Sequence, residues 1–143
     1  MAYSTDVSAA KALATKAHEG QTDKAGLPYI THPERVAARL ETPEAQVVGW
    51  LHDTVEDTEV TAAEIEARFG PQTAAAVDAI SRRENESWSG YLERVKGNPV
   101  ARVVKISDLI DNSNLSRIPR VTLKDVERQA KYNRALKELL EEG

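Results

Sequence analysis

Helix-start signals are the feature that most constrains the fold of this chain. A capping residue followed by proline occurs at Thr42-Pro43 and again at Asn98-Pro99. The side-chain oxygen of the first residue can cap a helix, and proline suits the first helical position. Pro71, directly after Gly70, is placed to open another helix. No segment alternates apolar and polar residues as a half-buried strand does. The pattern predicts an all-α fold, a single helical bundle of irregular topology.

Apolar spacing and further caps place the remaining helices. Asp6 or Ser8 can cap the first helix, and Thr61 with Glu64 forms a capping box for a later one. Gly26 and Pro28 break the chain into a loop over residues 20–31. The expected helices span residues 8–19, 32–40, 43–53, 61–69, 71–80, 88–96, 99–108 and 122–140.

Size and composition narrow the class of protein. A chain of 143 residues predicts one domain over residues 1–143. It has no cysteine, which excludes disulfides, thiolate zinc sites and cysteine nucleophiles and fits a cytoplasmic enzyme. The net charge of −4 argues against nucleic acid as a partner. There is neither a signal-peptide apolar region nor an apolar run of about 18 residues, so no membrane partner is expected. The composition predicts no particular oligomeric state.

The stretch from Trp50 to Thr58 holds the densest cluster of chemically useful side chains. His52 and Asp53 are adjacent, and Glu56 and Asp57 follow within one helical turn. Asp53, Glu56 and Asp57 are spaced to share one helical face. Carboxylates in an apolar segment are rarely buried unless they are paired or bind a metal. The stretch indicates either a divalent-metal site with a general acid or base beside it, or a helix end with solvated charges.

Two distant segments can supply further ligands. His32 precedes Pro33 at the entry of a helix, whereas His18, at a helix end, is more typical of a packed or solvated terminal histidine. Asp108 interrupts an otherwise apolar helix, where an unpaired aspartate would cost several kcal/mol, and Asn112 shares its face. Two histidines and two aspartates suit Mn²⁺ or Mg²⁺, with Fe²⁺ or Zn²⁺ as alternatives.

His32, His52-Asp53 and Asp108, in this order on a helical chain, resemble the H…HD…D signature of HD-domain metal-dependent phosphohydrolases. A longer set of motifs resembles the hydrolase domain of the alarmone (ppGpp) synthetase/hydrolases and the stand-alone small alarmone hydrolases. These motifs are residues 17–21, 28–33, 51–58 and 104–108, together with Asn112.

The resemblance implies a role for each matching residue. His32, His52, Asp53 and Asp108 would bind one Mn²⁺, or another divalent metal. Glu56 and Asp57 match the pair that activates the attacking water or relays its proton. The residues expected on the substrate side are Asp23, Lys24, Asn112 and Lys105. Arg82, Arg83 and Arg117 are additional candidates for phosphate contacts, although each alone is more typical of a solvated surface charge.

The implied activity is a guanosine-3′,5′-bis(diphosphate) 3′-pyrophosphohydrolase that releases GDP and pyrophosphate. The chain departs from the family where nucleotide hydrolases of this kind usually have Arg-Lys, since it has Asp23-Lys24. An aspartate cannot stack on a base as a guanidinium does. Two alternatives therefore stay open: hydrolysis of another nucleotide, such as an adenine alarmone or the 2′-phosphate of NADPH, and a non-catalytic nucleotide-binding module.

Overall fold

A computed structural model describes residues 2–141 and is helical throughout apart from turns, loops and one isolated β-bridge between Thr22 and Pro28. The helices are α1 (Val7–Ala17), α2 (Thr31–Ala38), α3 (Pro43–Leu51), α4 (Thr54–Asp57), α5 (Ala62–Phe69), α6 (Pro71–Ile80), α7 (Trp88–Lys96), α8 (Pro99–Asn112) and α9 (Leu123–Glu141). The all-α prediction is confirmed. No helix in the described part of the chain is long and apolar enough to cross a membrane.

The expected capping residues hold the helix ends. Thr42 and Asn98 accept hydrogen bonds from backbone N–H groups in the first turns of α3 and α8, and Asp6 does the same for α1. Thr61 caps α5 in the same way. Some boundaries differ from those expected. The helix expected over residues 43–53 ends at Leu51 and is followed by the separate short helix α4, and α8 continues past its expected end at Asp108 to Asn112. The extra turn is what puts Asn112 beside Asp108 and brings Asp111 into the interior.

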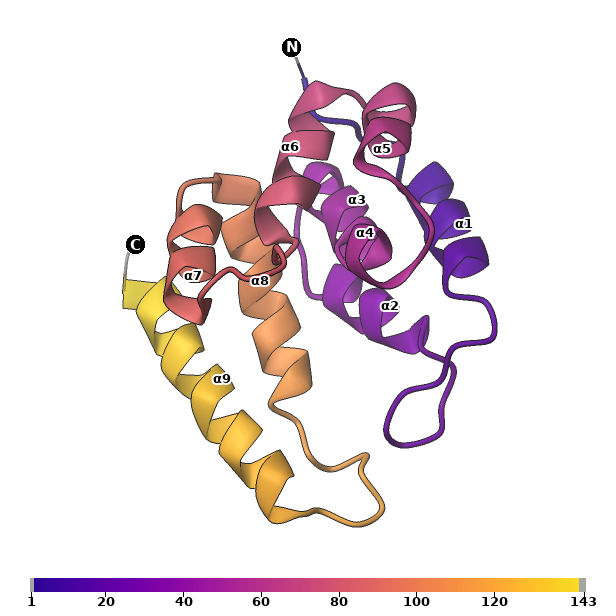
Figure 1. Cartoon of the computed structure of the whole chain (residues 1–143). Coiled ribbons are helices and arrows are strands. Elements are labelled where there is room, and N and C mark those ends of the chain that lie inside the picture. Colours follow the sequence, from indigo (N-terminus) through magenta and orange to yellow (C-terminus); the bar gives the residue numbers. More distant parts are fainter. Residues whose placement is uncertain (1, 142–143) are drawn as a thin grey trace.

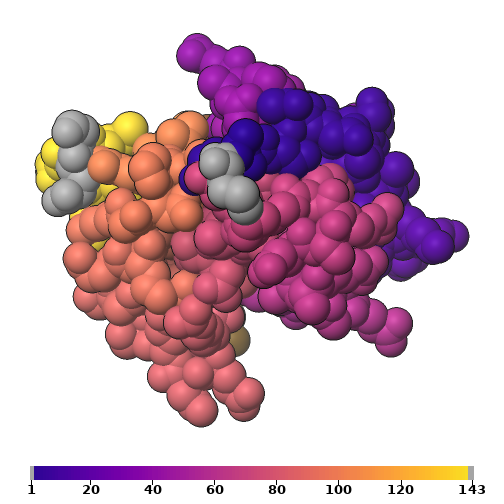
Figure 2. Space-filling view, turned by 90° about the horizontal axis from the view of Figure 1, so that it is seen from above, coloured from indigo at the N-terminus to yellow at the C-terminus, as the bar shows by residue number. Residues whose placement is uncertain are grey.

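The central helix α8 separates two hydrophobic clusters. Ala101 and Val104 belong to the larger cluster, which also involves α1, α2, α3, α5 and α6. Leu109 belongs to the smaller one, built with α7 and α9. Figure 1 shows α8 between the group α1–α6 and the pair α7 and α9. Seen from above in Figure 2, the yellow C-terminal helix lies against the orange of α8, across the molecule from the indigo of α1.

Helices α2 and α3 approach each other closely at Gly49. A methyl group at this position would meet Leu40 Cδ1 at 2.9 Å and the Cα of Ala37 at 3.1 Å. A glycine inside a helix weakens it relative to alanine by roughly 0.5–1 kcal/mol, so its presence here is explained by close packing. The contact brings the end of α3, with His52, next to the start of α2, with His32.

Candidate metal and catalytic site

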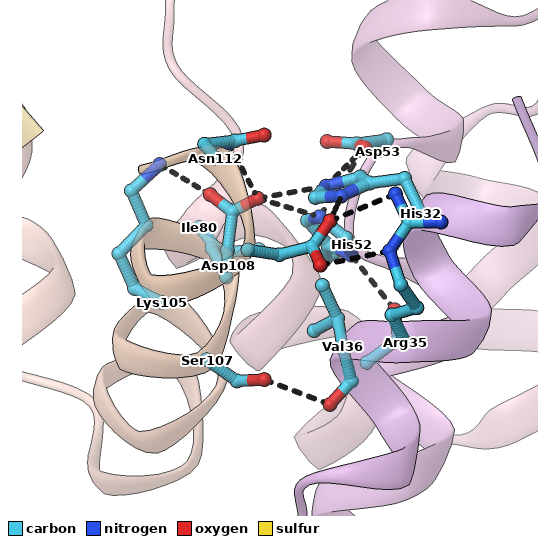
Figure 3. Close-up of polar contacts among 12 residues, drawn as sticks. His32, Arg35, Val36, His52, Asp53, Ile80, Lys105, Ser107, Asp108 and Asn112 are labelled. Atoms are coloured by element: carbon cyan, nitrogen blue, oxygen red, sulfur yellow. Dashed lines mark hydrogen bonds and ion pairs between the residues drawn. The ribbon is translucent and has the colours of Figure 1, made fainter. Parts of the chain in front are cut away.

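Four predicted metal ligands converge where α2, α3 and α8 meet (Figure 3). One potential ligand atom from each of His32, His52 and Asp53 lies within 4.8 Å of the other two. Asp108 approaches the same place from α8, since its Oδ1 lies 2.9 Å from His32 Nε2 and 3.3 Å from His52 Nε2. His32, His52 and Asp108 are buried, whereas Asp53 is partly open to solvent.

Hydrogen bonds at the back of both rings orient the histidines. His52 Nδ1 lies 2.7 Å from the Gly49 carbonyl oxygen and can only donate to it. His32 Nδ1 lies 2.7 Å from Asp111 Oδ2. In both rings Nε2 is therefore the atom that faces Asp53 and Asp108. A histidine whose far nitrogen is held by a carbonyl or a carboxylate is the usual arrangement of a metal-binding histidine.

The protonation balance of the site also fits a cation. Burial opposes a charge on His32, but hydrogen bonds to Asp108 and Asp111 outweigh it and raise its pKa to about 10. Burial likewise opposes a charge on Asp108, but Lys105 and the two histidines hold the pKa of its carboxyl group well below the usual range. The carboxylates thus stabilise a positive charge between them. Protonated histidine rings carry this charge when no metal is bound. Two imidazoles and two carboxylates form a donor set suited to a divalent ion.

Tyr29, in the loop before α2, supports Asp53. Its hydroxyl group donates a hydrogen bond to Asp53 Oδ2. Burial, with the nearby Asp53 charge, raises the pKa of Tyr29, so the phenol stays a neutral donor. The ring of Tyr29 packs against His18, which is buried rather than solvated and bonds through Nδ1 to Gln21 Oε1 at 2.9 Å. Tyr29, held in place by His18, therefore fixes the position of Asp53, one of the predicted metal ligands.

Glu56 and Asp57 lie on the short helix α4, directly after Asp53, and both are exposed. Glu56 Oε1 accepts a hydrogen bond from the backbone N–H of Arg82. Desolvation by the surrounding protein and the nearby Asp53 charge raise the pKa of both carboxyl groups, and in Glu56 they outweigh the hydrogen bond from Arg82, which lowers it. A raised pKa makes a carboxylate a better proton acceptor, which suits a general base.

A cavity of about 360 Å³ opens beside the four-residue cluster, between the loop after α1, the end of α8 and the start of α9. Asp23, Lys24 and Asn112, which the sequence places on the substrate side, line it, together with Arg117 and Arg128. Asn112 Nδ2 also donates to Asp108 Oδ1 at 3.0 Å, which joins the cavity to the cluster.

The two loop residues of the cavity already have partners. Asp23 Oδ1 accepts from the backbone N–H groups of Ala25 and Leu27, at 2.9 Å each. Lys24 Nζ lies 3.7 Å from Asp125 Oδ1 on α9. Asp23 therefore shapes the turn of residues 23–27, a role that its departure from the family pattern alone does not reveal.

The other residues predicted to contact phosphate lie in different parts of the structure. Lys105 is buried, and its Nζ lies 2.8 Å from Asp108 Oδ2, outside the lining of the cavity. Arg83 pairs with Asp78 at 2.8 Å on the exposed surface. Arg117 reaches the edge of the cavity and lies 3.5 Å from Asp111 Oδ1. Of these three, only Arg117 is placed to meet a ligand inside the cavity.

Asp111 has a structural role that the sequence reasoning did not assign. Besides His32, it binds Arg35 Nε at 2.8 Å and Arg39 at 3.3 Å, and it is almost fully buried. The signal was available, because Asp111 is a second aspartate on the same apolar helix as Asp108. Like Asp108, Asp111 needs a cation or strong hydrogen-bond donors when it is buried.

Comparison with known proteins places this geometry in a family. A family model described as "HD domain" matches residues 10–89. The "Guanosine-3′,5′-bis(diphosphate) 3′-pyrophosphohydrolase" of Aquifex aeolicus is 30% identical over 122 residues, which are 77% of this chain and 18% of that protein. The protein of the same name from Vibrio cholerae is 43% identical over 77 residues, 49% of this chain and 10% of that protein. This chain thus spans less than a fifth of these curated relatives.

A solved structure described as "A metazoan ortholog of SpoT hydrolyzes ppGpp and plays a role in starvation responses" matches with a TM-score of 0.79. The match covers 98% of this chain and 88% of that one at 20% identity, which supports the same fold. The predicted resemblance to alarmone hydrolase domains is confirmed by these relatives. The family model covers more than half of the chain, and the chain belongs to the HD-domain family.

Proposed function

We propose that this chain is a metal-dependent pyrophosphohydrolase acting on guanosine-3′,5′-bis(diphosphate). One observation carries the proposal: the His32, His52, Asp53 and Asp108 cluster adjoins both a pair of raised-pKa carboxylates and a cavity of nucleoside size lined by cationic and amide side chains. The names of the curated relatives support this choice of substrate. A single HD-domain unit over the whole chain would contain the complete site.

His32, His52, Asp53 and Asp108 would hold one divalent ion, and we propose Mn²⁺, which accepts a mixed set of imidazole and carboxylate ligands. A bound divalent ion lowers the pKa of water and neutralises charge on phosphoryl oxygens. The chain itself supplies the orientation: Gly49 and Asp111 aim the two Nε2 atoms, and Tyr29 and Asn112 each fix one carboxylate.

Glu56 or Asp57 would take a proton from the attacking water. The water oxygen forms a bond to the phosphorus next to the ribose 3′-oxygen, and the bond between that phosphorus and the 3′-oxygen breaks. The proton held by the carboxylate passes to the 3′-oxygen, so that one water and one substrate give GDP and pyrophosphate. Lys24, Asn112 and the cavity arginines would hold the nucleoside and its 5′-diphosphate by charge-assisted hydrogen bonds.

A substrate panel tests the proposed function. Purified protein with Mn²⁺ is given guanosine-3′,5′-bis(diphosphate), the matching adenine compound and NADPH, and products are identified by ³¹P NMR and anion exchange. We expect the guanine compound to have the highest kcat/KM and to release pyrophosphate, and the Asp108→Asn variant to release none. Faster release of phosphate from NADPH, or preference for the adenine compound, would mean that another nucleotide is the substrate.

Replacing Asp111 with asparagine should weaken metal affinity by roughly 10- to 100-fold, because it removes the carboxylate that orients His32. It should also lower the free energy of unfolding by about 3 kcal/mol, since Arg35 and Arg39 lose a buried counter-charge. Metal titration by calorimetry and urea unfolding measure the two effects. Asp78→Asn removes only an exposed ion pair and should change neither by much. An unchanged metal affinity in Asp111→Asn would contradict the orienting role.

A pair of substitutions at Asp23 separates its charge from its role in the turn. Asp23→Asn keeps an oxygen for the N–H groups of Ala25 and Leu27 but removes a negative charge from the cavity wall. We expect KM for a polyanionic nucleotide to fall about threefold, the scale of one partly exposed charge. Asp23→Ala removes the acceptor as well and should raise KM. Steady-state kinetics check both, and equal KM values in all three proteins would remove Asp23 from the substrate side.

A further inference from the structure

Three cationic side chains gather around Trp88, outside the lining of the cavity. Lys131 Nζ lies 4.2 Å from the centre of the Trp88 ring, Arg82 Cζ lies 5.5 Å from it and Lys105 Nζ lies 5.6 Å from it. They come from α9, from the loop after α6, and from α8. We call Arg82, Lys105, Lys131 and Trp88 the tryptophan cluster.

The positive charge of this cluster is only partly balanced. Lys105 pairs with Asp108, whereas neither the Arg82 guanidinium nor the Lys131 ammonium meets a carboxylate among residues 2–141. Burial, together with repulsion from Arg82 and Lys105, lowers the pKa of Lys131. Attraction between each cation and the face of the aromatic ring offsets part of this repulsion. An anion bound between these cationic groups would offset the remaining repulsion.

The tryptophan cluster borders the reacting centre on two sides. Lys105 donates to Asp108 Oδ2, while Asp108 Oδ1 faces the two histidines (Figure 3). The backbone N–H of Arg82 donates to Glu56. Tyr132, which lines the cavity, also packs on the cluster, with its ring centre 6.4 Å from that of Trp88. A nucleotide with its nucleoside in the cavity and its reacting phosphorus at the histidines would thus have the cluster just beyond that phosphorus.

We propose that the tryptophan cluster is an anion subsite that receives the outer phosphate of the diphosphate group being removed. The inference rests on the proposed function for the identity of the substrate, but the subsite itself recognises pyrophosphate by charge and can be tested with pyrophosphate alone. Lysine and arginine together bind such a group well, since arginine offers paired donors and lysine a compact charge. After cleavage the same groups hold the pyrophosphate product.

Binding of inorganic pyrophosphate to the protein with divalent ion in excess tests the proposal. Lys131→Gln and Arg82→Gln should each weaken pyrophosphate binding about tenfold, the loss expected for one charge-assisted contact. Lys137→Gln is the matched control, because Lys137 also lies on α9 but is 78% exposed and its described ion pair is with Glu141. The control should stay within about twofold of the parent, because exposed pairs contribute little.

A second measurement locates the ligand. The chain has two tryptophans, Trp88 and the core residue Trp50. Pyrophosphate should change the tryptophan fluorescence of the parent protein, and Trp88→Phe should abolish the change. Affinity for GDP should be unaffected in Lys131→Gln and Arg82→Gln.

Two results would overturn the subsite. The first is pyrophosphate affinity within twofold of the parent in both variants. The second is a loss of GDP affinity in place of pyrophosphate affinity, which would assign the cluster to the 5′-diphosphate. Because no turnover is needed, failure to hydrolyse the guanine substrate would refute the proposed function while leaving these results interpretable.

Discussion

Replacing Asp53 or Asp108 with alanine should strip the divalent metal from the protein and lower kcat by at least about a thousandfold. Each carboxylate faces both histidines, and the charge stabilisation that a metal supplies is worth several kcal/mol in the transition state. Metal content after dialysis, measured by mass spectrometry, and turnover under saturating substrate are the two measurements.

The controls for this prediction separate metal loss from unfolding. Asp108 is buried and also pairs with Lys105, so Asp108→Ala leaves that ammonium without its partner, whereas Asp53 is partly open. Asp108→Asn, which keeps the shape, and a far-ultraviolet circular dichroism spectrum show whether the helices remain. Full metal occupancy in both alanine variants would show that these aspartates are not ligands.

Local chemistry explains why so much of the fold is predictable from the sequence. The capping interactions of Thr42, Thr61 and Asn98 involve residues three positions along the chain, so the sequence displays both partners. Gly70 and Pro71 mark the change from α5 to α6 in the same local way. Helix ends that depend on packing are harder: α8 extends to Asn112 because Asp108 and Asp111 find partners on α2.

The candidate site shows the same contrast between features visible in the local sequence and features that depend on tertiary packing. His32, His52, Asp53 and Asp108 could be proposed because their residue types and spacing resemble a known signature. The partners that orient them are distant in sequence, since His32 and Asp111 are 79 residues apart. The tryptophan cluster joins Arg82, Lys105 and Lys131 only through tertiary packing around Trp88. No spacing rule brings such residues together, so a sequence pattern could not have found the cluster.

The turn of residues 23–27 shows how the structure refines an interpretation drawn from sequence. The resemblance to alarmone hydrolases predicts an arginine at this position, so the sequence alone favours interpreting Asp23 as a change in base recognition. Its carboxylate holds two backbone N–H groups of the turn, so an arginine introduced alone would lose both hydrogen bonds. A difference from the family at one position can therefore reflect a different loop as well as a different ligand.

Glu56→Gln and Asp57→Asn should lower kcat while leaving the metal in place. Both carboxylates follow Asp53 on α4, but neither belongs to the group of atoms that converges on His32 and His52. General acid–base groups typically contribute about 10²–10⁴-fold to the rate. Changing the residue that takes the proton to an amide should therefore lower kcat by a factor of that size. Turnover and metal content of each variant, measured side by side, test this division of roles.

The two carboxylates are not equivalent, and the structure indicates which one should matter more. The Glu56 carboxylate accepts the Arg82 N–H and lies next to the tryptophan cluster, whereas the hydrogen bond between Asp57 and Gln21 involves only the backbone carbonyl of Asp57. We expect Glu56→Gln to reduce kcat more than Asp57→Asn does, with KM little changed in either, because a proton acceptor acts in the transition state. Glu59→Gln, an exposed change just after α4, is the matched control and should leave kcat near the parent value. If both amide variants retain kcat within a few-fold of the parent, Glu56 and Asp57 are structural and the proton acceptor lies elsewhere in the site.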